Sequence, residues 1–307
     1  MLVRRRKNKV RNSLDDRIYY VFCYAFCILL TLLVLYPLIY VVSCSFSSGT
    51  AVSNGQVVLW PVDATLEGYR RVVNYPGIWR AYLNTLFYTV GGTLLHVALV
   101  MTCAYPLARK GLARKGLPGK VPVTLYFSFT MLFGGGLIPG YLLIRNLGML
   151  NTIWAMLIPG AFSAYNMVVA RTFISTTCSG EMLDATQVDG CSDAMFFFRF
   201  VLPLSKAVIA VIAMQVAIGI WNSYFNAFLY LSKDELYPLQ ILLRKILLLS
   251  QIQASDLMDD EMAEMMQGMA DLMKYSLIVF ATLPILCVYP FAQKYFVKGV
   301  MIGSIKG

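Results

Sequence analysis

Residues Glu181 to Pro203 read EMLDATQVDGCSDAMFFFRFVLP and form a polar island between two long apolar segments of a 307-residue chain. The apolar residues are spaced as on short amphipathic helices, and Gly190 divides them into two groups. Glycine accepts backbone conformations that other residues resist, so we expect two helices that meet at Gly190. The residues that give the stretch its character are Glu181, Asp184, Ala185, Thr186, Asp189, Gly190, Leu202 and Pro203.

Both predicted helices carry start and stop signals. Thr177 or Ser179 can cap the first helix, and Glu181 lies in its first turn, where an acid is favoured by the helix dipole. Ser192 can start the second helix, and Pro203 marks its end. An ordinary cytoplasmic loop helix is the alternative interpretation, because short motifs also occur by chance.

The composition indicates an integral membrane protein. Hydrophobic residues make up 58% of the chain, charged residues only 14%, and the mean hydropathy is +0.65. The core of a soluble protein does not normally hold that much apolar surface. Several uncharged runs reach the roughly 20 residues that cross a bilayer as helix. Lipid offers no hydrogen-bond partners to the backbone N–H and C=O groups, so such runs must be helical. We therefore expect an all-α fold.

The sequence predicts six transmembrane helices. After a basic segment of residues 1–17, a single domain covers residues 18–307. Gly134-Gly135-Gly136 interrupts the third span, and helix should not run unbroken through these glycines. The loop 175–203 is expected in the cytoplasm and the loop 232–273 outside it. The six spans are placed at about 18–46, 78–108, 118–134, 151–174, 204–231 and 274–293.

The distribution of charge sets the orientation. Residues 1–17 carry seven basic residues and the loop 109–120 carries five. The segments assigned to the cytoplasm hold 18 of the 26 Lys and Arg, and the outer segments hold ten of the 16 Asp and Glu. A basic excess inside predicts that both termini are cytoplasmic in a plasma membrane. The net charge of +10 then reflects anchoring beside anionic lipid and requires no nucleic acid.

The sequence offers no catalytic or metal-binding constellation. The seven Cys lie mostly in apolar segments without a pairing framework, so we expect neither disulfides nor a metal site. His96, the one histidine, lies in the second span with no Cys, His or acid near it in sequence. It is more consistent with a packed or pore-facing side chain than with a ligand.

Amides and aromatic residues in two spans are candidates for a transport pathway. Amides beside aromatic rings can bind a solute that carries both polar groups and apolar faces. Asn222 and Asn226 are four residues apart and should share one helix face, as should Asn84 and Tyr88. Contacts between helices are the alternative role for each of these residues. The candidates are Asn84, Tyr88, Trp221, Asn222, Tyr224, Phe225 and Asn226.

The loop 232–273 holds eight of the 16 acids, and the methionines near its end are spaced as on a helix. An acidic amphipathic helix outside the membrane is expected to contact a protein partner. The residues proposed for this contact are Asp256, Asp259, Asp260, Met262 and Met266.

If the chain serves transport, the energy must come from another chain. The predicted spans contain no Asp or Glu to relay protons, and the sequence has no phosphate-binding loop of the form GxxxxGK[ST]. The first observation disfavours a secondary carrier, and a helical cytoplasmic loop is a suitable docking surface. A membrane scaffold or sensor subunit remains a second class and a secondary carrier a third, and a permease for a non-sugar solute is a further alternative.

Four segments resemble the carbohydrate-uptake permeases of ABC importers related to the MalG maltose permease, particularly the LplC/YtcP-type group. They are the island itself, LYPLIYVVSCSFS (35–47), FGGGLIPGYLLIRNLGMLNTIWAMLIPGAFSAYNMVVARTF (133–173) and YPFAQKYFVKGVMIGSIKG (289–307). The island resembles the family's EAA loop, in which Glu-Ala-Ala is followed by Asp-Gly and Leu-Pro. Here Asp184-Ala185-Thr186 keeps the acid's charge and adds a hydroxyl.

The resemblance implies the type I ABC importer permease fold and a non-catalytic subunit. It also implies that residues 175–203 dock a homodimeric ATPase that binds ATP-Mg. Further implied partners are a second, non-identical permease and an extracytoplasmic solute-binding lipoprotein that delivers an oligosaccharide. The outer loop 232–273 would then meet that lipoprotein.

Overall fold

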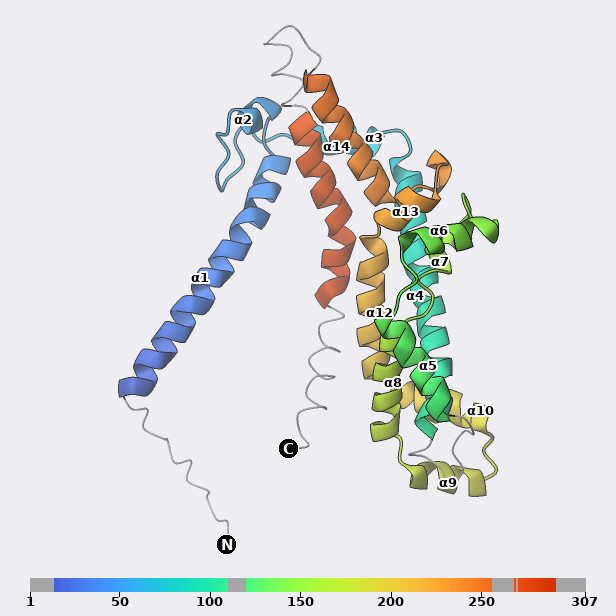
Figure 1. Cartoon of the computed structure of the whole chain (residues 1–307). Helices are drawn as coiled ribbons and strands as arrows, with labels where there is room; N and C mark the ends of the chain where they lie inside the picture. The colour runs from blue at the N-terminus through green and yellow to red at the C-terminus, as the bar shows by residue number, and fades with distance from the viewer. Residues whose placement is uncertain (1–13, 110–119, 256–267, 269, 291–307) are drawn as a thin grey trace. The chain divides into compact units, whose positions relative to one another are not determined.

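The computed structural model describes residues 14–109, 120–255, 268 and 270–290, and every regular element within them is a helix (Figure 1). The prediction of an all-α chain is therefore confirmed. The chain divides into two compact units, which comprise residues 1–72 with 250–279 and residues 73–249 with 280–307.

The first unit is built on α1 (Leu14–Ser45), which is apolar and exposed along almost its whole length. At about 1.5 Å per residue it exceeds the roughly 30 Å of a hydrocarbon layer, and a helix that is apolar all round suits lipid. Only its last turns pack, where Cys44 joins α2 (Gly49–Ser53) and Val57 in a small core. Ser43 donates a hydrogen bond to the carbonyl of Leu59 at 2.6 Å and so fixes the chain that leaves this core. The short helix α3 (Glu67–Asn74) follows.

The second unit is organised around α4 (Ile78–Ala108). Helices α8 (Ala164–Thr177) and α12 (Lys206–Trp221) run beside α4 and pack on it and on each other (Figure 1). A small residue allows this approach, since a Cβ on Gly92 would lie 2.7 Å from Cδ1 of Ile220 on α12. The remaining helices of this unit are α5 (Lys120–Leu132), α6 (Leu137–Asn146), α7 (Trp154–Leu157), α9 (Gly180–Val188), α10 (Asp193–Phe196), the π-helical turn η2 (Phe197–Val201), α11 (Leu202–Leu204), α13 (Phe225–Tyr230) and the 3₁₀ turn η3 (Asp234–Leu236).

Glycine interrupts the third predicted span as expected. Helix α5 ends at Leu132, and the chain turns by 113° into α6 through the three glycines. Gly136, which precedes α6, has a φ of +82°, a left-handed conformation that favours glycine. The prediction that helix does not continue through the glycines is therefore confirmed.

Two predicted spans are not continuous helices. Within 151–174, α7 stops before Pro159-Gly160 and helix resumes only at Ala164. Within 204–231, α12 ends at Trp221 and α13 begins at Phe225. Proline, glycine and polar side chains end the helical backbone ladder inside each run.

Judged by length and composition, fewer helices qualify as membrane spans among the described residues than the six predicted. Among the described residues, three helices qualify as membrane spans, namely Asp15–Ser45, Ile78–Ala108 and Ala270–Pro290. Two bent pairs of helices raise the count to five if each pair is one span. The predicted six-helix count is thus not confirmed.

A helix that the sequence reasoning missed occupies the outer connection. Helix α14 (Leu239–Ser255) lies where residues 232–273 were interpreted as a polar loop. Its first part belongs to the second unit, in which Leu239, Ile241 and Leu242 are buried. The acids of the connection cluster after residue 255, and their presence obscured the apolar periodicity before it.

Candidate functional site

Helix α9 forms where the island was predicted to begin a helix. The side chain of Ser179 accepts a hydrogen bond from the Met182 amide at 3.3 Å, and Glu181 occupies the first turn. Leu183 is the buried residue of the helix and enters a core shared with Ile174 and Met101. One buried side chain therefore attaches α9 to the bundle, and most of its surface stays exposed.

The turn after α9 is a Schellman motif that ends at Gly190. The Gly190 amide donates to the Gln187 carbonyl at 3.0 Å, and the Cys191 amide donates to the Thr186 carbonyl at 2.9 Å. Gly190 has a φ of +80°, which a residue with a side chain adopts only under strain. This confirms the prediction that two helices meet at Gly190, and it gives the physical reason for a glycine there.

The second helix starts at Ser192, whose side chain accepts from the Met195 amide at 3.3 Å. Phe196 is fully buried, and its ring stacks on Phe200 at a centroid distance of 5.4 Å. The helix widens into the π turn η2, and α11 ends at Leu204, one residue after Pro203. The segment Asp193–Leu204 then meets α12 at 75°.

An ion pair joins this loop to α4. Nη2 of Arg109 lies 2.9 Å from Oδ1 of Asp193, and both side chains are partly exposed. Tyr105, one turn earlier on α4, has its ring 5.3 Å from that of Phe197 and 6.4 Å from that of Phe196. Charge and ring packing together fix α10 against the end of α4.

Several apolar side chains on the loop are exposed. Val188 is 89% exposed and Phe198 66%, and Met195 is also exposed. The acids Glu181, Asp184 and Asp189, together with Ala185, are exposed too. An exposed apolar group rimmed by charge is typical of a protein-docking surface. Thr186 is half-buried and donates its hydroxyl to the Leu183 carbonyl at 2.9 Å. Of the remaining predicted residues, Leu202 is half-buried and Pro203 is exposed.

The loop also contains two cysteines in different surroundings. Cys178 is fully buried between α8 and α9, whereas Cys191 is partly exposed. Burial raises the pKa of the Cys178 thiol above its ordinary value, because an apolar environment disfavours the thiolate.

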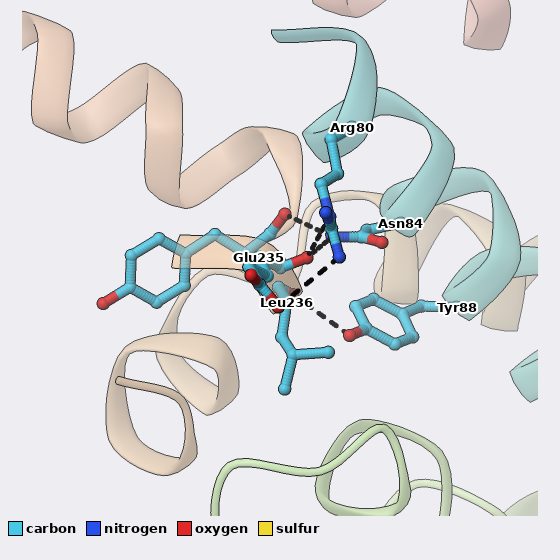
Figure 2. Close-up of polar contacts among 6 residues, drawn as sticks. Arg80, Asn84, Tyr88, Glu235 and Leu236 are labelled. Atoms are coloured by element: carbon cyan, nitrogen blue, oxygen red, sulfur yellow. Dashed lines mark hydrogen bonds and ion pairs between the residues drawn. The ribbon is translucent and has the colours of Figure 1, made fainter. Parts of the chain in front are cut away.

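At the other end of α4, three side chains hold the segment that contains η3 (Figure 2). Nδ2 of Asn84 donates to the carbonyls of Glu235 at 2.8 Å and Tyr237 at 3.1 Å. The Tyr88 hydroxyl donates to the Leu236 carbonyl at 3.0 Å, and Nε of Arg80 donates to that of Glu235 at 3.0 Å. The structure places Asn84 and Tyr88 on one face of α4, as predicted, and their polar groups bind backbone. Their proposed contact with substrate stays a prediction.

The candidates near the end of α12 are separated by its break. Trp221 is buried and its Nε1 donates to the Ala281 carbonyl at 3.1 Å. Asn222 lies just after α12 and donates to the Ile218 carbonyl at 2.9 Å, whereas Asn226 belongs to α13. The prediction that these two asparagines share one helix face is wrong, because helix stops between them.

The break leaves several of these side chains accessible. Asn222, Phe225 and Asn226 are exposed, and Tyr224 is half-buried. The Tyr224 ring lies 5.7 Å from that of Phe228, and Cζ of Arg244 lies 4.4 Å over its centroid. Amides and aromatic rings are therefore gathered at the break between α12 and α13.

His96 packs inside the second unit. Its Nδ1 lies 2.8 Å from the Gly160 carbonyl and its Nε2 lies 3.0 Å from Nδ2 of Asn166. A carbonyl only accepts, so Nδ1 carries the proton and Nε2 of the neutral ring accepts from the Asn166 amide. His96 on α4 therefore contacts both Gly160, which precedes α8, and Asn166 on α8, as expected of a packed polar residue.

A cavity of about 520 Å³ lies between α4, α12 and the last described helix. It is lined almost wholly by apolar side chains, with the hydroxyl-bearing Thr89, Thr93 and Tyr289 among them. Of the predicted pathway residues only Trp221 reaches it. Such a lining suits hydrocarbon better than sugar hydroxyls.

Some predicted residues are outside the structure's reach. Asp256, Asp259, Asp260, Met262 and Met266 lie outside the described residues, so their contact with a partner stays a prediction. Within the described ranges, no three His, Cys, Asp or Glu side chains group as metal ligands would.

The structure also adds residues that the sequence did not single out. Arg109 was one basic residue among five in its loop, and Asp193 one acid in the island. Arg80 and Arg244 stood out from no pattern. Their partners are about 20 to 160 positions away in sequence, so no local signal could have identified them.

No protein-family model matches the chain. Two curated proteins of Bacillus subtilis (strain 168) are similar over most of its length. The polygalacturonan/rhamnogalacturonan transport system permease protein YtcP is 35% identical over 294 residues, which cover 96% of this chain and 100% of YtcP. Protein LplC is 38% identical over 274 residues, which cover 88% of this chain and 89% of LplC.

A solved structure is also similar. It is a chain from the crystal structure of a bacterial ABC transporter involved in the import of the acidic polysaccharide alginate. The TM-score is 0.81 at 32% identity, and the match covers 93% of this chain and 99% of the other.

Proposed function

Since the chain belongs to the permease subunits of carbohydrate ABC importers, a family of multi-pass membrane proteins, we propose that it forms half of an oligosaccharide pathway driven by a separate ATPase. The observation that carries the proposal is the loop from α9 to α11. It is fixed to α4 and α8 from within, and its outward surface is apolar and acidic.

The loop is proposed as the surface on which the ATPase docks. A docking element has to be rigid to pass on a motion, and the caps at Ser179 and Ser192 with the Gly190 turn provide that rigidity. Exposed Val188 and Phe198 supply the apolar contact that an interface core needs. This chain would be a non-catalytic subunit, with ATP-Mg bound by the ATPase.

The substrate is proposed to be an oligosaccharide. YtcP is named for transport of polygalacturonan and rhamnogalacturonan, and the solved relative for import of alginate. The exposed amides of Asn222 and Asn226 and the ring of Phe225 offer the chemistry that a sugar binds. Trp221 is proposed to support this lining from behind, because it is buried and hydrogen-bonded to Ala281.

The remaining partners follow from this role. A second, non-identical permease would complete the pathway, and a homodimeric ATPase would drive it. An extracytoplasmic solute-binding lipoprotein would deliver the sugar to the outer loop, where Asp256 to Met269 is proposed as its contact. Deletion of that stretch should weaken lipoprotein docking and leave ATPase assembly intact.

The orientation is proposed from charge. The candidate docking loop and both termini would face the cytoplasm, which places η3 and α14 outside. The basic excess in the segments assigned to the cytoplasm supports this arrangement.

Site-specific photo-crosslinking tests the docking surface. A photoreactive amino acid at Val188, the most exposed apolar residue of the loop, should give an adduct with the ATPase subunit. The matched control is Leu147, which is 61% exposed beside α6 and should give none. An ATPase adduct at Leu147 and none at Val188 would contradict the proposal.

A further inference from the structure

Arg244 is held in place by an aromatic ring. Its Cζ lies 4.4 Å over the centroid of the Tyr224 ring, and the side chain is exposed. An arginine over an aromatic ring is stabilised by the ring's negative face, which limits its freedom without neutralising its charge. Among the residues that the structure describes, no carboxylate pairs with Arg244.

Two other cations of this region, Lys245 and Arg80, form ion pairs of their own. Lys245, the next residue on α14, lies 3.4 Å from a carboxylate oxygen of Asp234. Arg80 lies 3.6 Å from a carboxylate oxygen of Glu235. Asp234 and Glu235, which are adjacent on η3, thus pair with cations other than Arg244.

The surroundings of Arg244 match the chemistry of a sugar. Tyr224 connects it to the break between α12 and α13, where Asn222, Phe225 and Asn226 are exposed. Phe228, stacked beside Tyr224, is 63% exposed and adds an apolar ring. Amides can bind hydroxyls and rings can cover the apolar face of a pyranose. A free guanidinium adds a partner for a carboxylate, which it can bind with two parallel hydrogen bonds.

We propose that Arg244, positioned by Tyr224, is a specificity-determining residue that binds the carboxylate of a uronate-containing oligosaccharide at the outer end of the pathway. This inference rests on the proposed function and narrows its substrate from oligosaccharides in general to anionic ones. Tyr224 acts by holding Arg244 in place, so its ring matters more than its hydroxyl.

The test uses the complete importer, with both permeases, the ATPase and the lipoprotein, in proteoliposomes. Uptake is measured for two uronate trisaccharides, trigalacturonate and trimannuronate, and for two neutral ones, maltotriose and xylotriose. Arg244→Gln should raise KM for the uronate substrate at least about tenfold, because a charge-assisted contact is lost. Arg244→Lys should restore part of the loss, and Tyr224→Phe should behave as wild type.

Two controls separate recognition from structure. Lys245→Gln changes an adjacent exposed cation and should leave uronate uptake unchanged. Thermal unfolding of the Arg244→Gln complex and its ATPase activity without substrate should also match wild type.

Other outcomes discriminate clearly. If Arg244→Gln lowers uptake of neutral and uronate sugars equally, or of neither, Arg244 does not bind a carboxylate of the substrate. If the wild-type importer takes up only the neutral trisaccharides, this inference is overturned and the proposed function stands. If the wild-type importer takes up none of the four trisaccharides, the proposed function is contradicted as well.

Discussion

Arg109 donates a hydrogen bond to Asp193 at 2.9 Å and so joins the end of α4 to α10. At the start of the same helix, Arg80 donates to the carbonyl of Glu235 at 3.0 Å. The 31 residues of α4 cover about 46 Å at 1.5 Å per residue. One rigid helix therefore touches the candidate docking loop at one end and the η3 segment at the other.

The ion pair predicts a measurable coupling between Arg109 and Asp193. Both side chains are partly exposed, so the pair should contribute only about 0.2–1 kcal/mol to stability. Arg109→Gln and Asp193→Asn should each lower substrate-stimulated ATP hydrolysis, and the double variant should lose less than the sum of the two. Fully additive losses in this double-mutant cycle would show that the pair does not transmit motion.

Asn84 and Asn222 should respond differently to the same substitution. Asn84→Leu removes two hydrogen bonds to backbone carbonyls, so the protein should lose about 1–3 kcal/mol of stability. Asn222→Leu removes one exposed hydrogen bond to its own helix, so assembly and basal ATPase activity should persist. Uptake should fall, because the proposed contact between the Asn222 amide and the sugar is lost. Thermal unfolding and uptake of both variants provide the comparison.

The contrary result for each asparagine is distinct. Failure of the Asn222→Leu complex to assemble would make Asn222 a packing residue. Unchanged uptake would remove it from the pathway. An Asn84→Leu protein as stable as wild type would mean that the η3 segment does not depend on Asn84.

The one histidine can be observed directly. Nitrogen-15 labelling of histidine gives a single ring, and its spectrum should show a protonated Nδ1 and an unprotonated Nε2. His96→Leu leaves the Gly160 carbonyl and the Asn166 amide without this partner and should cost about 1–3 kcal/mol for each group. A spectrum with the proton on Nε2 would contradict the contact with Gly160.

Cys178 gives a pH-dependent probe of the loop. Because burial raises its pKa, the reactive thiolate is scarcer than in a free cysteine at the same pH, and it increases as pH rises toward the raised pKa. In single-cysteine variants, maleimide should label partly exposed Cys191 readily at pH 8, and Cys178 slowly but faster at higher pH. Equal labelling rates at pH 8 would show that α8 and α9 do not pack as described.

Asp184→Lys tests the charge of the docking surface. Asp184 is exposed on α9, so reversal of its charge should leave folding and membrane insertion unchanged. It should nevertheless weaken binding of the ATPase, because the charge faces outward. Normal ATPase binding by the variant at low ionic strength would exclude Asp184 from the interface.

Local signals predicted the helices of the candidate docking loop. Ser179, Ser192 and Gly190 act through contacts within five residues of sequence, so their roles follow from residue type and spacing. The long helix α4 was predicted with its observed bounds, because a continuous apolar run determines it.

Long-range pairs could not be predicted in the same way. Trp221 donates to the carbonyl of Ala281, 60 residues away, and the role of Asn84 depends on carbonyls about 150 residues away. A hydropathy average over many residues masks the polar groups of Asn222 and Tyr224. The fifth span was therefore predicted to continue through the break. Arg244 meets Tyr224 only because α14 folds back toward α13, and residue type alone did not indicate that contact.

The central claim is that the rigid turn at Gly190 couples this chain to an ATPase. The most direct measurement is substrate-stimulated ATP hydrolysis by the complete importer carrying Gly190→Val. Gly148→Val is the matched control, since Gly148 also has a positive φ, of +68°, with open space around it, and lies outside the loop. We expect stimulation to be lost in Gly190→Val and retained in Gly148→Val, with both variants inserted in the membrane. Full stimulation in Gly190→Val would contradict the coupling role of the loop.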